Sequence, residues 1–75
     1  MQYENLGEVE KKVLGALMIL ADIENNKVKA TMKDIADTIG YKVPGGAITY
    51  ALRGLERDNF ILRSPQNKQE LKLLV

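Results

Sequence analysis

The sequence contains no cysteine and no histidine among its 75 residues. Without cysteine, neither a disulfide bond nor a thiolate metal site can form. Without histidine, the chain lacks the commonest metal ligand and the side chain that most often acts as a general base near neutral pH. We therefore expect no metal and no other cofactor. We expect apolar packing to stabilise the fold, and the 45% hydrophobic content suffices for one core.

Long apolar segments are also missing. The longest apolar run, residues 16–21, is much shorter than the roughly 18 residues of a membrane-spanning helix, so we expect no membrane partner. The N-terminal segment MQYENLGEVE is acidic, unlike a secretory signal or a transit peptide, which favours a cytoplasmic protein. We expect one small domain, 1–75, which buries only about 60% of the surface that its unfolded chain exposes.

The residue patterns that support catalysis are missing as well. Ser64 is the only serine, and no base lies near it in the sequence. Gly45 and Gly46 lack the further glycine and the strand-to-helix context of a dinucleotide-binding loop, and there is neither an HExxH motif nor a P-loop. The carboxylates are scattered over expected helix surfaces. We therefore expect no catalytic residue and a protein that is not an enzyme.

Charge is small in sum but unevenly distributed. The formal net charge is +1. Residues 1–38 contain five Lys/Arg against seven Asp/Glu, whereas residues 39–75 contain six against three. The C-terminal half is therefore the positive one, and this asymmetry favours a polyanionic partner.

The first predicted helix spans residues 8–25 and ends at the Asn pair 25–26. Leu14, Met18 and Ala21 form a second apolar stripe beside its core face. Either the helix packs between two neighbours, or the stripe is the interface of a homodimer, since exposed apolar surface is hard to leave in water on so small a chain. The expected core face is Val9, Val13, Ala16, Leu17, Leu20 and Ile23.

A short strand and a second helix are expected next. Residues 27–30 alternate in polarity, which predicts two or three strand residues. Thr31 is typical of an N-cap, and Asp34 three residues later completes an approximate capping box. The predicted helix spans Met32–Ile39, because Gly40 supplies a C-terminal stop.

A tight turn, residues 41–46, connects this helix to a third one. Pro44 and the two glycines after it favour a sharp change of direction. The third helix is predicted over Ala47–Asp58, with Asn59 as a left-handed stop. Its expected buried face is Ile48, Ala51, Leu52 and Leu55.

The C-terminal segment predicts a β-hairpin. Residues 60–64 and 70–75 have strand character, and the polar run 65–69 separates them. Residues 1–6 have no clear pattern, and we expect them to be disordered. The order helix, strand, helix, turn, helix, hairpin predicts a winged helix-turn-helix, mostly α with a small antiparallel β-sheet (α+β), in which the hairpin 61–75 is the wing.

The third helix offers a surface for nucleic acid, because a helix fits the major groove and its exposed side chains then meet base edges. Arg53 suits a guanine edge, and Thr49 suits a base or a phosphate. Tyr50 either reaches a phosphate or covers the core edge, half-buried. Arg57 either holds a phosphate or pairs with a neighbouring carboxylate. Further candidates, either phosphate contacts or ordinary solvated side chains, are Thr31, Lys33 and Lys42 near helix starts and Asn67 and Lys68 at the wing tip.

The segment TMKDIADTIGYKVPGGAITYALRGLERDNFI, with ELKLLV after it, resembles the N-terminal DNA-binding domain of LexA-type repressors. The resemblance covers residues 8–75 and implies a winged helix-turn-helix that binds operator DNA, usually as a dimer. Val43 stands where the family usually has a polar residue, and the family's self-cleaving peptidase domain has no counterpart. Allowing one extra residue in the turn, the family's base contacts fall on Gly46, Ala47, Thr49 and Tyr50.

We therefore predict sequence-specific binding of double-stranded DNA by a small transcriptional regulator of the repressor type. Without the peptidase domain, the dimer contact is expected on the first helix. One alternative is a winged-helix module for protein–protein interaction, which the low net charge favours. Another is the DNA-binding part of a plasmid or virus replication or segregation protein, which the same residues would serve equally well.

Overall fold

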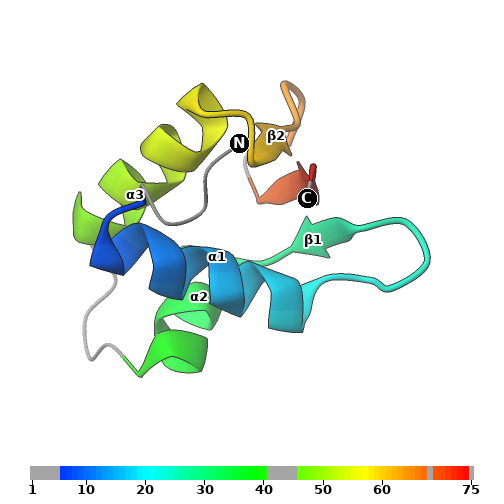
Figure 1. The fold of residues 1–75 in the computed structure, drawn as a ribbon. Coiled ribbons are helices and arrows are strands. Elements are labelled where there is room, and N and C mark those ends of the chain that lie inside the picture. Colours follow the sequence, from blue (N-terminus) through cyan, green and yellow to red (C-terminus); the bar gives the residue numbers. More distant parts are fainter. Residues whose placement is uncertain (1–5, 41–45, 68, 75) are drawn as a thin grey trace.

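The structure, a computed structural model, describes residues 6–40, 46–67 and 69–74. These residues form three helices and a three-stranded antiparallel sheet (Figure 1). The predicted class, mostly α with a small antiparallel sheet, is confirmed. In chain order the elements are α1 (Glu8–Leu20), β1 (Lys27–Lys29), α2 (Met32–Ile39), α3 (Gly46–Arg57), β2 (Ile61–Arg63) and β3 (Glu70–Leu73).

The sheet has the order β1-β3-β2, so the last strand lies between the other two. The predicted hairpin is confirmed, and β1 joins it on the far edge, where Val28 pairs with Leu71. Side chains alternate between the two faces of a strand, so Val28 and Leu71 point to the core together with Ile61 and Leu73. The other face is left to solvent.

Helix α1 lies between its two neighbours, with α2 below it and α3 above it in Figure 1. Its buried face is therefore wider than one stripe. Leu14 is only 1% exposed and is one of the largest fully buried side chains, so its expected place on a dimer surface is wrong. Of the other two residues in that stripe, Met18 is 53% exposed and Ala21 is half-buried. The predicted packing between two neighbours is confirmed.

The end of α1 differs from the prediction, because the helix stops at Leu20 and Ala21 is extended. The next residues form a tight turn in which the Asp22 N–H donates to the Lys27 carbonyl at 2.8 Å. The Asp22 Oδ1 accepts the Glu24 N–H at 2.9 Å, a side-chain bond that competes with helix continuation. Ile23, expected in the core, is consequently 94% exposed.

Helix α2 has the predicted bounds. The Thr31 Oγ1 accepts the Asp34 N–H at 3.1 Å, and the Asp34 Oδ2 accepts the Thr31 N–H at 3.0 Å, so the predicted capping box is confirmed. Gly40 has φ +94° and its N–H donates to the Ala36 carbonyl at 2.8 Å, which ends the helix. A side chain is strained in this left-handed conformation, which explains the glycine.

Helix α3 begins and ends one residue before the predicted bounds. Its predicted buried face is confirmed, with Gly54 added to it, and Asn59 has φ +65°, as expected for the stop. The predicted turn falls mostly on residues 41–45, outside the described residues. The expected disorder of Leu6 is wrong. This residue is buried in the hydrophobic core, because its apolar side chain packs with the other core residues.

In the part of the chain that the structure describes, no helix is long and apolar enough to cross a membrane.

Candidate nucleic-acid interface

The outward face of α3 carries most of the predicted contact residues. The helix buries its apolar face against α1, so its polar residues are turned to solvent. Tyr50 is 77% exposed, so the alternative of a half-buried tyrosine at the core edge is wrong. The exposed residues of α3 are Gly46, Ala47, Thr49, Tyr50, Arg53, Glu56 and Arg57.

A hollow of about 250 Å³ lies where the start of α2, α3 and the loop end of the hairpin meet. It brings Thr31 and Thr49, predicted from distant parts of the sequence, to one place. The bond from the Ala30 N–H to the Gln69 carbonyl, 2.9 Å long, ties the hairpin to the start of α2 there. The hollow is lined by Ala30, Thr31, Met32, Ile35, Thr49, Leu52, Arg63, Gln69 and Leu71.

Arg63 and Gln69 belong to this surface, although the sequence did not single them out as contact residues. Arg63 pairs with Leu71 in the sheet and therefore points to the helix side, beside α3. It is half-buried. The signal in the sequence was its spacing of two from Ile61, which puts both side chains on the same face of β2. Gln69 had no such signal, since its place depends on the contact of the hairpin with α2.

The loop of the hairpin is closed by its own polar residues. The Ser64 Oγ accepts the N–H groups of Gln66 and Asn67, both at 3.3 Å. The Asn67 Oδ1 accepts the Gln69 N–H at 3.0 Å. Asn67, predicted as a contact residue, therefore has a structural part in shaping the loop. Lys68 lies outside the described residues, as does Lys42.

At the start of α2, the capping box of Thr31 and Asp34 already uses groups that a phosphate would need. Bonds from the Thr31 backbone N–H and hydroxyl lower the pKa of Asp34, so this carboxylate is ionised at neutral pH. Its negative charge lies where a phosphate was expected, and the Thr31 hydroxyl is engaged with the Asp34 N–H. Lys33, beside it, is exposed. Of the two residues predicted to hold phosphate near this helix start, Thr31 is engaged in the cap, whereas the Lys33 side chain is exposed to solvent.

The cations of α3 differ in their surroundings. Arg57 Nε lies 3.6 Å from Asp58 Oδ1, so the alternative in which Arg57 pairs with a neighbouring carboxylate is confirmed. Both side chains are exposed, and such a pair contributes roughly 0–1 kcal/mol. Within the described ranges, Arg53 has no ion pair within 4.0 Å. Of the two arginines of α3, Arg53 is therefore the one without an ion pair among the described residues.

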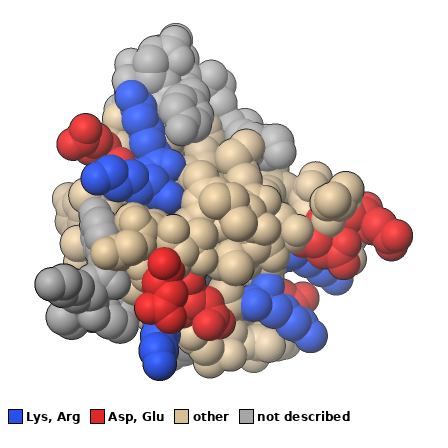
Figure 2. All heavy atoms as spheres, turned by 90° about the horizontal axis from the view of Figure 1, so that it is seen from below, with Lys and Arg blue, Asp and Glu red and all other residues tan. Residues whose placement is uncertain are grey.

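The lower face of the molecule, on the side of α2 in Figure 1, shows no concentration of cations. Figure 2 shows the face seen from below Figure 1, where Lys and Arg alternate with Asp and Glu around a large uncharged area. No continuous basic surface is visible there.

The described residues also contain no group of three His, Cys, Asp or Glu side chains that could hold a metal ion.

Comparison of the chain with family models, curated proteins and solved structures found no match. The resemblance to LexA-type repressors stays a prediction from the quoted residues.

Proposed function

We propose that the protein is a small winged helix-turn-helix regulator that binds double-stranded DNA through the exposed face of α3. The element order, two helices in succession followed at once by a β-hairpin, supports this fold assignment. The observation that carries the function is the exposure of Thr49, Tyr50 and Arg53 on one helix beside the hollow lined by Thr31 and Arg63.

The dimensions of α3 suit the major groove of B-form DNA. Its 12 residues make a helix of about 18 Å at 1.5 Å per residue, and the groove is about 12 Å wide. In such a complex Arg53 pairs with a guanine edge, and Thr49 contacts a base or its thymine methyl group. Tyr50 reaches the backbone.

Residues around α3 would hold the phosphates on either side. Arg63 and Gln69 lie at the loop end of the hairpin, and Lys33 lies at the start of α2. Contacts of this kind set register and affinity, whereas the α3 side chains set sequence preference. Because the basic residues are few, we expect the affinity for DNA to depend only weakly on salt. The slope of log K against log salt concentration should be about −0.9 for each phosphate that a protomer neutralises.

Selection of bound duplexes from a random DNA pool tests this function. We expect one enriched sequence, and two inverted copies of it if the protein binds as a homodimer on a pseudo-palindromic site. A pool that stays random after repeated rounds at moderate salt would contradict the proposal. The places where the enriched sequence occurs in the genome would then separate the candidates. Copies beside genes would indicate a repressor, and copies at an origin would indicate a replication or segregation protein.

A protein-interaction module is the second candidate, and two acidic residues favour it. Glu56 lies on the exposed face of α3, and the ionised Asp34 lies at the start of α2. Both reduce the positive potential of the proposed DNA surface. A stable protein complex whose affinity hardly changes with salt, formed by a chain that enriches no duplex, would favour this second function.

A further inference from the structure

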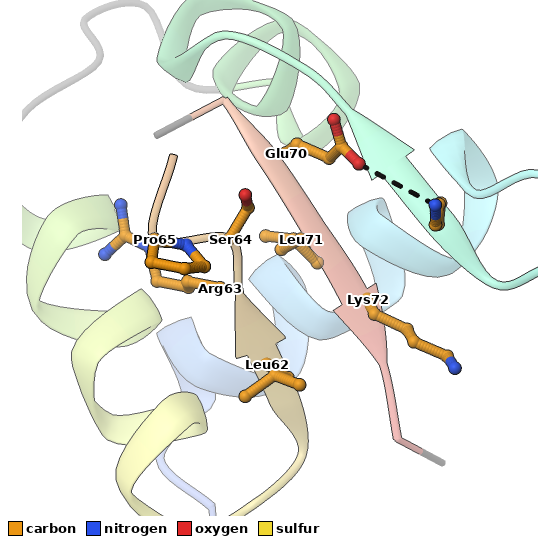
Figure 3. Close-up of a pocket in the computed structure, with 8 residues that line it drawn as sticks. Leu62, Arg63, Ser64, Pro65, Glu70, Leu71 and Lys72 are labelled. Atoms are coloured by element: carbon orange, nitrogen blue, oxygen red, sulfur yellow. Dashed lines mark ion pairs between the residues drawn. The ribbon is translucent and has the colours of Figure 1, made fainter. Parts of the chain in front are cut away.

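The sheet carries a second shallow hollow, which shares Arg63 and Leu71 with the hollow beside α3 and otherwise has its own lining. Its volume is about 210 Å³, or about seven water molecules at ~30 Å³ each, which leaves room for a four-carbon side chain. Figure 3 shows Leu62, Ser64 and Pro65 on the β2 side, with Glu70 and Lys72 on β3. Leu62 is 58% exposed there, so the hollow has an apolar floor that nothing in the described chain covers.

The rim of this hollow is mostly basic. Lys27 and Lys72 are direct partners in the sheet, so their side chains leave the same face of neighbouring strands. Glu70 is the one acidic residue that lines the hollow, and its Oε1 lies 4.0 Å from the Lys27 Nζ (Figure 3). Within the described ranges, Lys72 has no ion pair within 4.0 Å. An apolar group flanked by carboxylates would therefore fit this place.

The turn after α1 presents such a group. Ile23 is 94% exposed, and the exposed carboxylates of Asp22 and Glu24 flank it. The turn is held by bonds from Asp22 N–H to the Lys27 carbonyl and from Asn26 N–H to the Asp22 carbonyl, both at 2.8 Å. The side chain is thus displayed by an ordered turn, and little conformational entropy is lost when it binds.

These bonds also decide which copy of the chain supplies the group. They hold the turn against the start of β1, and the high exposure of Ile23 shows that it does not enter the hollow of its own chain. A second copy brings the same acidic turn and the same basic hollow. Two copies related by a two-fold axis can exchange turns, because each contact then occurs twice.

We propose that the protein self-associates by docking the turn Asp22–Glu24 of each copy into the sheet hollow of the other. Ile23 covers Leu62, the carboxylate of Glu24 pairs with Lys72, and the carboxylate of Asp22 pairs with Lys27. The contact uses neither α3 nor the start of α2, and Arg63 is the residue of the proposed DNA surface that also lines the docking hollow. It does not depend on that function, because self-association is measured without DNA.

Sedimentation equilibrium of the full chain, from low micromolar to millimolar concentration, tests the proposal. We expect a monomer–dimer equilibrium that Ile23→Ser weakens by about tenfold or more. The matched control is Ile19→Ser on α1, since Ile19 is also highly exposed, at 75%, but lines a hollow beside Thr38 and Ile39 of α2 and does not line the sheet hollow. This control should leave the equilibrium unchanged.

Charge reversal tests the pairing itself. Lys72→Glu alone and Glu24→Lys alone should each weaken the dimer, and the double variant should recover part of the loss, because the opposite charges face each other again. A wild-type chain that stays monomeric at millimolar concentration would overturn the proposal. So would a dimer that Ile19→Ser weakens and Ile23→Ser does not, since α1 would then be the interface. Growth beyond dimers would overturn the reciprocal exchange.

Discussion

Two glycines in helix interiors should respond differently to replacement by alanine. Glycine inside a helix is less stable than alanine by roughly 0.5–1 kcal/mol. At Gly15 in α1, an added Cβ would meet nothing within 4 Å. Gly15→Ala should therefore raise the free energy of unfolding by the full amount, about 0.5–1 kcal/mol. In a domain of this size that corresponds to a rise in Tm of about 2–8 °C.

At Gly54 in α3, the same change meets the carboxylate of Glu10. The new Cβ would lie 2.4 Å from Glu10 Oε2 and 3.1 Å from Glu10 Cδ, so this side chain must move. Its Oε1 accepts the Gly7 N–H at 3.2 Å, which satisfies a free donor at the start of α1. Loss of that bond costs about 1 kcal/mol. Gly54→Ala should therefore gain nothing, and its Tm should lie about 4–8 °C below that of Gly15→Ala.

A double-mutant cycle identifies the cause. In a Glu10→Ala background the obstacle is gone, and Gly54→Ala should then stabilise the fold by about 0.5–1 kcal/mol, as Gly15→Ala does. Urea unfolding followed by circular dichroism gives the four free energies. If Gly54→Ala stabilises the wild-type chain as much as Gly15→Ala, the packing of Glu10 against α3 does not restrict this position, and the reasoning is wrong.

Three further predictions concern the caps and the core. Thr31→Ala should lower the free energy of unfolding by about 0.5–2 kcal/mol, measured by urea titration, whereas Thr31→Ser should keep most of it because the hydroxyl remains. The lowered pKa of Asp34 implies stability that is fully present above its ordinary value of 3.8 and is lost as the pH falls below it through the lowered value. Thermal unfolding of Asp34→Asn should accordingly depend less on acidification, and an equal dependence would contradict the pKa argument. Leu17→Ala should cost about 2–5 kcal/mol, since Leu17 is fully buried, and a loss below 1 kcal/mol would show that the core there collapses around the gap.

The sequence predicted best where the controlling contacts are local. Helix α2 was predicted in full because Thr31 and Asp34 bond to each other within one turn and Gly40 ends the helix by its own conformation. The buried face of α3 was predicted for the same reason, since its apolar residues repeat at helical spacing. Hairpin strands were recognisable from the alternation on either side of a polar loop.

Prediction failed where turn bonds outside the helical pattern, or distant segments, decide the outcome. Ile23 continues the apolar spacing of α1, but the turn bonds of Asp22 and the pairing of Val28 with Leu71 require the chain to leave the helix earlier. Leu14 is buried because α1 has neighbours on two sides, which a helical pattern cannot show. The places of Arg63 and Gln69 depend on the hairpin meeting the start of α2.

The central claim, that α3 reads DNA, is tested most directly by fluorescence titration of the selected duplex with two variants of equal charge. Arg53→Ala removes the exposed cation of α3 that has no ion pair among the described residues, and Lys12→Ala removes an exposed cation of α1. We predict that Arg53→Ala raises the Kd about tenfold or more, in line with the ~1–3 kcal/mol of a base-reading arginine, and that Lys12→Ala changes it less than about twofold. Equal effects of the two variants, or none from either, would contradict the account.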